Sequence, residues 1–107
     1  MPQLDIAALR KAVEENRYLI TQHAQQRMGL RKVTHADIKY VVARGDVIEQ
    51  YPDNQPHPKA LFMAHVDGQP LYVSCAFDRS YAYIITVHRY DTERWLDPWT
   101  RRKERKE

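Results

Sequence analysis

The sequence predicts an α+β fold, with N-terminal helices packed on one face of a four-stranded antiparallel meander sheet and a short helix at the C-terminal end. Helical periodicity is clearest in the first 45 residues. Alternating strand patterns fill most of residues 46–90, and Asp67-Gly68 is a strong signal for a two-residue hairpin turn. Helices on one face of such a sheet leave the other face for solvent, a partner or a ligand.

Three helices are expected before the sheet. Residues 4–16 repeat apolar side chains with helical spacing. The second helix begins after Thr21, whose hydroxyl can accept a hydrogen bond from an unpaired backbone N–H. The third begins after Thr34, where Asp37 completes a capping box, and it ends at Gly45.

The predicted sheet follows the third helix. Its four strands are expected in residues 46–51, in 59–66, from Pro70 onward, and in 81–90. Residues 17–20, between the first two helices, are expected to be extended but to lie outside this sheet. The two-residue turn places Phe62 opposite Val73 and Ala60 opposite Cys75, on an apolar face that meets the helices.

The two faces of the last strand differ in polarity. The more apolar set, assigned to the core, is Tyr83, Ile85 and Val87. Thr86 and His88 then lie on the opposite face, together with Tyr72. This assignment requires an odd number of residues in the loop after Asp78. Beyond the strand, residues 91–99 are expected to form the short helix, with Trp95 folded back on the sheet.

Length and composition fit one domain, residues 1–100, followed by a charged tail, residues 101–107. No apolar run is long enough to span a membrane, so no membrane association is expected. The first residues do not have the pattern of a signal or transit peptide. The single cysteine, Cys75, excludes an internal disulfide, and a reduced cytoplasmic location is expected.

Basic side chains are concentrated in the helical half. Residues 10–44 carry eight Lys/Arg and three Asp/Glu, whereas residues 45–100 carry four and eight. The net charge of +3 comes from the tail, because residues 1–100 carry 12 side chains of each sign. A basic helical half is compatible with a polyanionic partner such as RNA. The alternative is an ordinary solvated helix surface.

No metal or cofactor motif is present. The five histidines form no HxxxH or HExxH pair, and Cys75 has no second cysteine with which to hold zinc. The three glycines do not form a phosphate-binding loop. Neither a cofactor nor a metal site is therefore predicted.

The remaining chemistry lies on one helical ridge and on the last strand. His23, Arg27 and Arg31 are four residues apart, so their side chains are expected along a single side of the second helix. Gly29 weakens the end of this helix, so the alternative for Arg31 is a position in the following turn. Cleavage of RNA by its own 2′-hydroxyl needs a proton acceptor, a proton donor and positive charge at the phosphate. The predicted catalytic residues are His23, Arg27, Thr86 and His88, and the predicted nucleic-acid-binding residues are Arg31 and Tyr72.

A non-catalytic protein-interaction module is the alternative function. In that case His23 and Arg27 are structural residues, paired with buried partners, and the free sheet face or edge binds another protein or a second copy of the chain. Binding of nucleic acid without cleavage is a further alternative. Burial of His23 and Arg27 discriminates between the structural and the catalytic hypotheses.

Several stretches resemble an uncharacterised bacterial family, domain of unknown function 4258, over roughly residues 18–96. They are Thr21 to Met28 (TQHAQQRM), Arg31, Gly45, Ile48, Tyr51-Pro52, Pro70 to Val73, Ile85 to Val87, and Trp95. Tyr72 and His88 depart from the family pattern, in which His and Tyr are expected at these two positions. If the two positions face each other, the exchange keeps both groups in one site.

The element order also looks like that of RelE and BrnT toxins, small domains that cleave RNA and are held by an antitoxin. This second resemblance implies a toxin-like, metal-independent ribonuclease with an antitoxin-like protein partner. It is an analogy between folds, and a fold does not determine a function.

Overall fold

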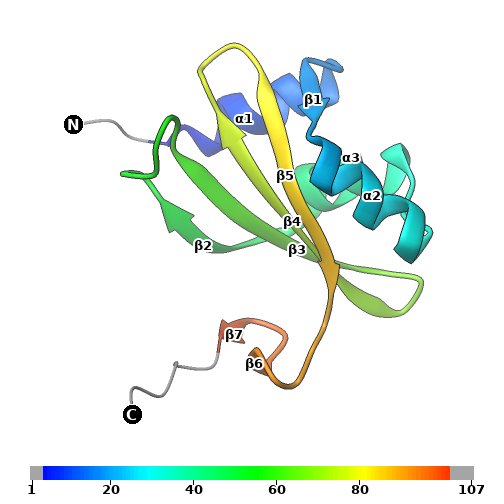
Figure 1. Cartoon of the computed structure of the whole chain (residues 1–107). Coiled ribbons are helices and arrows are strands. Elements are labelled where there is room, and N and C mark those ends of the chain that lie inside the picture. Colours follow the sequence, from blue (N-terminus) through cyan, green and yellow to red (C-terminus); the bar gives the residue numbers. More distant parts are fainter. Residues whose placement is uncertain (1–3, 102–107) are drawn as a thin grey trace.

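The computed structural model describes residues 4–101, and in this part of the chain three helices accompany a five-stranded mixed sheet and a two-stranded hairpin (Figure 1). The elements are α1 (Ile6–Glu14), β1 (Tyr18–Ile20), α2 (Gln22–Arg31), α3 (His35–Arg44), β2 (Asp46–Tyr51), β3 (Lys59–Val66), β4 (Gln69–Phe77), β5 (Ala82–Arg89), β6 (Trp95–Asp97) and β7 (Thr100–Arg101). The large sheet has the strand order β1-β5-β4-β3-β2, so the first strand lies at one edge.

The predicted four-stranded meander is wrong because β1 joins the sheet and pairs parallel to β5. The Thr21 N–H donates to the Ile84 carbonyl and the Ala82 N–H donates to the Arg17 carbonyl, each over 3.0 Å. Three residues are too few to show a strand period, and the partner strand lies more than 60 residues later. The sheet is therefore mixed, not antiparallel.

The predicted C-terminal helix is also wrong. Residues 95–101 form the β6–β7 hairpin instead, in which Trp95 pairs with Arg101. Pro98 cannot supply a helical N–H, and the Asp97 carboxylate accepts a hydrogen bond from the Trp99 backbone N–H over 2.9 Å, which stabilises the turn. Of the predicted tail, Arg101 belongs to β7, and residues 102–107 lie outside the described residues.

The helix starts are confirmed. The Thr21 hydroxyl accepts from the Ala24 N–H over 3.2 Å, and Thr34 and Asp37 form the complete capping box. The α2 helix extends to Arg31, and Lys32 ends it with a left-handed backbone at φ 55°. Arg31 therefore lies on the same helical ridge as His23 and Arg27.

The hairpin between β3 and β4 is confirmed. Asp67 and Gly68 both have positive φ, 56° and 77°, as the two-residue turn requires. The strand register pairs Phe62 with Val73 and Ala60 with Cys75, as predicted. These buried residues face the helices.

The predicted faces of β5 are correct at one end and wrong at the other. Phe77 pairs with Ala82, so four residues lie between these paired positions, whereas the predicted faces require an odd number. Ala82 and Ile84 therefore enter the core instead of Tyr83 and Ile85. A bulge at Ile85 then restores the expected alternation, because it adds one residue to β5. As a result Thr86 lies opposite Ser74, and His88 lies opposite Tyr72.

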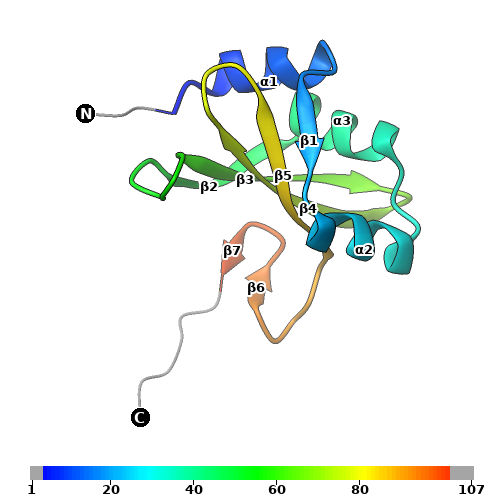
Figure 2. The same ribbon diagram turned by 45° about the horizontal axis from the view of Figure 1, so that its top comes forward.

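The sheet separates two apolar clusters. The main core lies between the helices and the sheet, and its largest buried members include Leu9, Ile38, Phe62 and Ile84. The smaller cluster lies on the other face, where the β6–β7 hairpin covers it: Leu61, Met63, Tyr72 and Trp95. Figure 2 shows α1 and α3 on one side of the sheet and this hairpin on the other. Trp95 is folded back on the sheet, as predicted.

Candidate functional site

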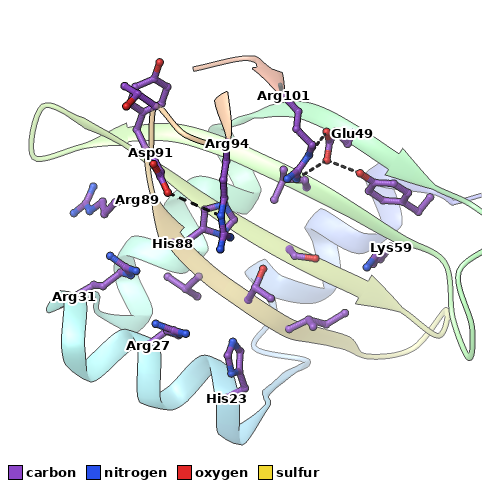
Figure 3. A pocket seen from close by; sticks show the side chains of 18 residues that line it. His23, Arg27, Arg31, Glu49, Lys59, His88, Arg89, Asp91, Arg94 and Arg101 are labelled. Carbon is purple, nitrogen blue, oxygen red and sulfur yellow. Dashed lines mark hydrogen bonds and ion pairs between the residues drawn. The ribbon is translucent and has the colours of Figure 1, made fainter. Parts of the chain in front are cut away.

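An open cavity of about 750 Å³ lies on the sheet face that carries the hairpin. One wall is α2, the floor is mainly β5, and the opposite wall is the segment from Tyr90 to Arg101 together with parts of β2 and β3 (Figure 3). The cavity is therefore lined by elements that lie far apart in the sequence.

The α2 wall carries His23, Arg27 and Arg31 on successive helical turns, and all three side chains are exposed. The neighbouring Ala24 and Met28 are buried and hold this helix against the core. Within residues 4–101, no hydrogen bond and no acidic partner engages any of the three ridge side chains. The guanidinium charges of Arg27 and Arg31 and the imidazole nitrogens of His23 are thus available to a ligand.

The floor carries Thr86 and His88. The imidazole of His88 lies on Tyr72, and its Nε2 is buried without a hydrogen-bond partner among the described residues. Burial, followed by the positive charges of Arg94, Arg101 and Arg31, lowers the pKa of His88 to about 4. His88 is therefore neutral at pH 7.

A hydrogen-bonded carboxylate fixes the opposite wall. Glu49 accepts two hydrogen bonds from the Arg101 guanidinium, over 2.9 and 3.0 Å, and one from the Tyr51 hydroxyl over 2.5 Å. The Arg101 bonds lower the pKa of Glu49 below its usual range. The same guanidinium lies 4.7 Å from the centroid of the Trp95 ring. Arg101 thus attaches the hairpin to the edge strand β2.

Three further cations line the cavity. Arg89 donates to the backbone carbonyls of Val66 and Gln69 over 3.0 and 3.1 Å, which engages it at the end of the β3–β4 hairpin. Lys59 lies 5.3 Å from the centroid of the Tyr51 ring. Arg94 is largely exposed, and in the described part of the chain its one ion pair is with Asp91, at 3.9 Å.

The structure brings five of the six predicted site residues to this cavity: His23, Arg27, Arg31, Thr86 and His88. Tyr72 is the exception. It has no exposed surface, and its hydroxyl donates to the Pro98 carbonyl over 2.6 Å, so it supports the floor and cannot contact an RNA. Sequence reasoning missed Arg94 and Lys59. The only available signal was their charge, because their position depends on how the chain folds around the sheet.

No group of three or more His, Cys, Asp or Glu side chains among the described residues is arranged to hold a metal ion. Burial raises the pKa of the Cys75 thiol to about 12, so this cysteine stays protonated in the core. In residues 4–101, no helix is long and apolar enough to cross a membrane.

A family model described as "Domain of unknown function (DUF4258)" matches residues 20–89. The chain belongs to this family. No curated protein and no solved structure matches the chain, so the expected likeness to the RelE and BrnT fold is not confirmed. The DUF4258 region contains α2 and β5, which carry His23, Arg27 and Thr86, whereas Arg94 and Arg101 lie beyond its end.

Proposed function

We propose that this DUF4258 protein is an RNA-directed domain that acts as a toxin-like ribonuclease. The observation that carries the proposal is the exposed His23–Arg27–Arg31 ridge, which has no acidic partner within residues 4–101 and shares one cavity with Thr86. A row of exposed arginines without carboxylate partners is suited to bind an anionic ligand.

The side chains fit cleavage by the 2′-hydroxyl of the RNA itself. His23, the exposed imidazole of the cavity, takes the proton of the 2′-hydroxyl as the 2′-oxygen bonds to phosphorus. The bond from phosphorus to the 5′-oxygen breaks, and the departing oxygen takes a proton from a water molecule that the open cavity admits. The hydroxide that remains takes the proton from His23, which restores the neutral imidazole. The products are a 2′,3′-cyclic phosphate and a 5′-hydroxyl.

The other residues position the phosphate. Arg27 and Arg31 hold its non-bridging oxygens and stabilise the negative charge that grows as the 2′-oxygen adds. Thr86 donates a hydrogen bond from the floor and orients the ribose. His88 is neutral at pH 7 and its Nε2 is buried, so its contribution is to shape the floor.

A non-catalytic interaction module remains the second candidate, and one observation favours it. Leu19 on the edge strand β1 is 55% exposed, and an edge strand can pair with a strand from a protein partner of the antitoxin type or from a second copy. This candidate also requires His23 and Arg27 to be structural residues with buried partners. Both side chains are exposed, which argues against that requirement.

The test is cleavage of a fluorophore-labelled single-stranded RNA in EDTA, with and without ribosomes, by the wild type and by His23→Gln. The control is His65→Gln, an exposed histidine of β3 that does not line the cavity. We expect His23→Gln to lose on the order of 100-fold or more in rate, with the control unchanged. Equal rates for all three proteins, or no cleavage under any condition, would refute the proposal.

A further inference from the structure

Some arginines of the cavity are held by hydrogen bonds within the protein, and others are not. Arg101 is engaged by Glu49, and Arg89 by two backbone carbonyls. Among residues 4–101, Arg94 has only a long contact with the exposed carboxylate of Asp91, and such a surface pair contributes little to stability. Arg94 is therefore available to a ligand, like Arg27 and Arg31.

These available arginines come from opposite walls. Arg27 and Arg31 extend from α2, whereas Arg94 extends from the segment after β5 toward the floor at His88 (Figure 3). Arg31, Arg94 and His88 line the same cavity, and Arg94 is directed toward His88 (Figure 3). No carboxylate lies between the two walls on the floor strand β5.

We infer that the cavity binds single-stranded RNA across two consecutive phosphates, with Arg27 and Arg31 on the phosphate that is cleaved and Arg94 on its neighbour. This inference rests on the proposed function. A strand carries a charge at every nucleotide, so cations on two walls can each hold a different phosphate of one chain. A single phosphate held by the α2 ridge would leave Arg94 with only its long contact to Asp91 among the described residues.

The size of the cavity selects a single strand. About 750 Å³ is the volume of a site for one small organic molecule, which is comparable to one or two nucleotides. Single-stranded RNA can enter with its bases turned outward, whereas a duplex presents a broad groove and fixed phosphates. Arg94 itself lies beyond the region that the family model matches, residues 20–89.

Fluorescence anisotropy with a labelled single-stranded RNA of about ten nucleotides tests the inference across a salt series. Arg94→Ala is compared with Arg27→Ala and with a matched control, Arg44→Ala, which removes an exposed arginine at the end of α3 on the helix side of the sheet. We expect Arg94→Ala to weaken binding on the order of tenfold and to reduce the salt slope by about 0.7. The RNA duplex of the same sequence is expected to bind more weakly.

The outcomes separate the inference from the proposed function. If Arg27→Ala loses affinity and Arg94→Ala behaves like Arg44→Ala, the two-phosphate site is refuted and the ribonuclease proposal stands. Equal binding of duplex and single strand refutes the single-strand preference. Unchanged far-UV circular dichroism of each variant confirms that a loss of affinity comes from the missing guanidinium.

Discussion

The imidazole of His88 stacks on the phenol ring of Tyr72, with 5.0 Å between the ring centroids and 6° between the planes. The Tyr72 ring in turn stacks on Trp95 at 4.5 Å. Three aromatic rings thus form a continuous stack from the floor of the cavity to the C-terminal hairpin. Burial raises the pKa of Tyr72 to about 12, so its hydroxyl keeps its proton and continues to donate to Pro98.

Replacing His88 by Phe should reduce the sensitivity of the fold to acid. The folded state lowers the pKa of His88 from 6.5 to about 4, so between these values the unfolded chain binds more protons than the folded protein. Neutral His88 contributes its full stabilisation of the folded state above pH 6.5, the pKa of this residue in the unfolded chain. This contribution is lost as the pH falls toward 4. The wild type should therefore lose on the order of 3 kcal/mol more than His88→Phe over this window.

Urea unfolding of both proteins at about pH 7.5 and about pH 4.5 measures this difference. Phe keeps a flat ring on Tyr72 and removes the unpaired Nε2, so the variant should be at least as stable as the wild type at the higher pH. Parallel losses in the two proteins would show that other groups account for the acid sensitivity.

The substitution Glu49→Gln should loosen the C-terminal hairpin. It removes the charge that holds Arg101 at 2.9 Å and so weakens the attachment of β7 to β2. Chymotrypsin should then cleave after Trp95, which is fully buried in the wild type, several-fold faster. Glu14→Gln, a change at an exposed residue of α1, is the control. Identical cleavage rates would mean that stacking on Tyr72 alone holds the hairpin.

Two glycines should respond to alanine in opposite ways. A Cβ at Gly45 would lie 2.3 Å from the Val41 carbonyl oxygen and 2.6 Å from that of Met63, and both atoms belong to the backbone. Gly45→Ala should therefore cost more than about 2 kcal/mol. A Cβ at Gly29 would meet nothing within 4 Å, so Gly29→Ala should gain about 0.5–1 kcal/mol through helix propensity. Thermal unfolding of both variants measures the contrast.

Arg27→Ala should remain folded. The side chain is exposed, and its loss should change the free energy of unfolding by less than about 0.5 kcal/mol. The comparison is Ile38→Ala, which removes a fully buried side chain and should cost about 2–5 kcal/mol. A large destabilisation by Arg27→Ala would support the structural role that the interaction-module hypothesis requires.

The sequence predicted those parts of the site that depend on neighbours in the chain. The ridge on α2 follows from four-residue spacing, and the turn at Asp67-Gly68 follows from two residues that tolerate positive φ. The position of Thr86 on the polar face was also predicted, but for an incomplete reason. The even loop after Phe77 reverses the faces, and the bulge at Ile85 reverses them again.

The missed features depend on partners that are distant in the sequence. Three residues of β1 carry no pattern of their own and become a strand only beside β5. Arg94 acquires its place because the chain returns over the sheet after β5, attached through Trp95 and Arg101. Neither event leaves a local sequence signal, since both depend on surfaces that exist only in the folded protein.

The parallel pairing of β1 with β5 has a consequence for the order in which the protein is made. Residues 18–20 leave the ribosome early, but their hydrogen-bonding partners, Ala82–Ile84, are synthesised more than 60 residues later. Until then, α2 lacks the strand against which it packs, and the wall and the floor of the cavity have not met. A nascent chain therefore has no assembled site until β5 has been synthesised, and the proposed activity can begin only after that strand has joined the sheet.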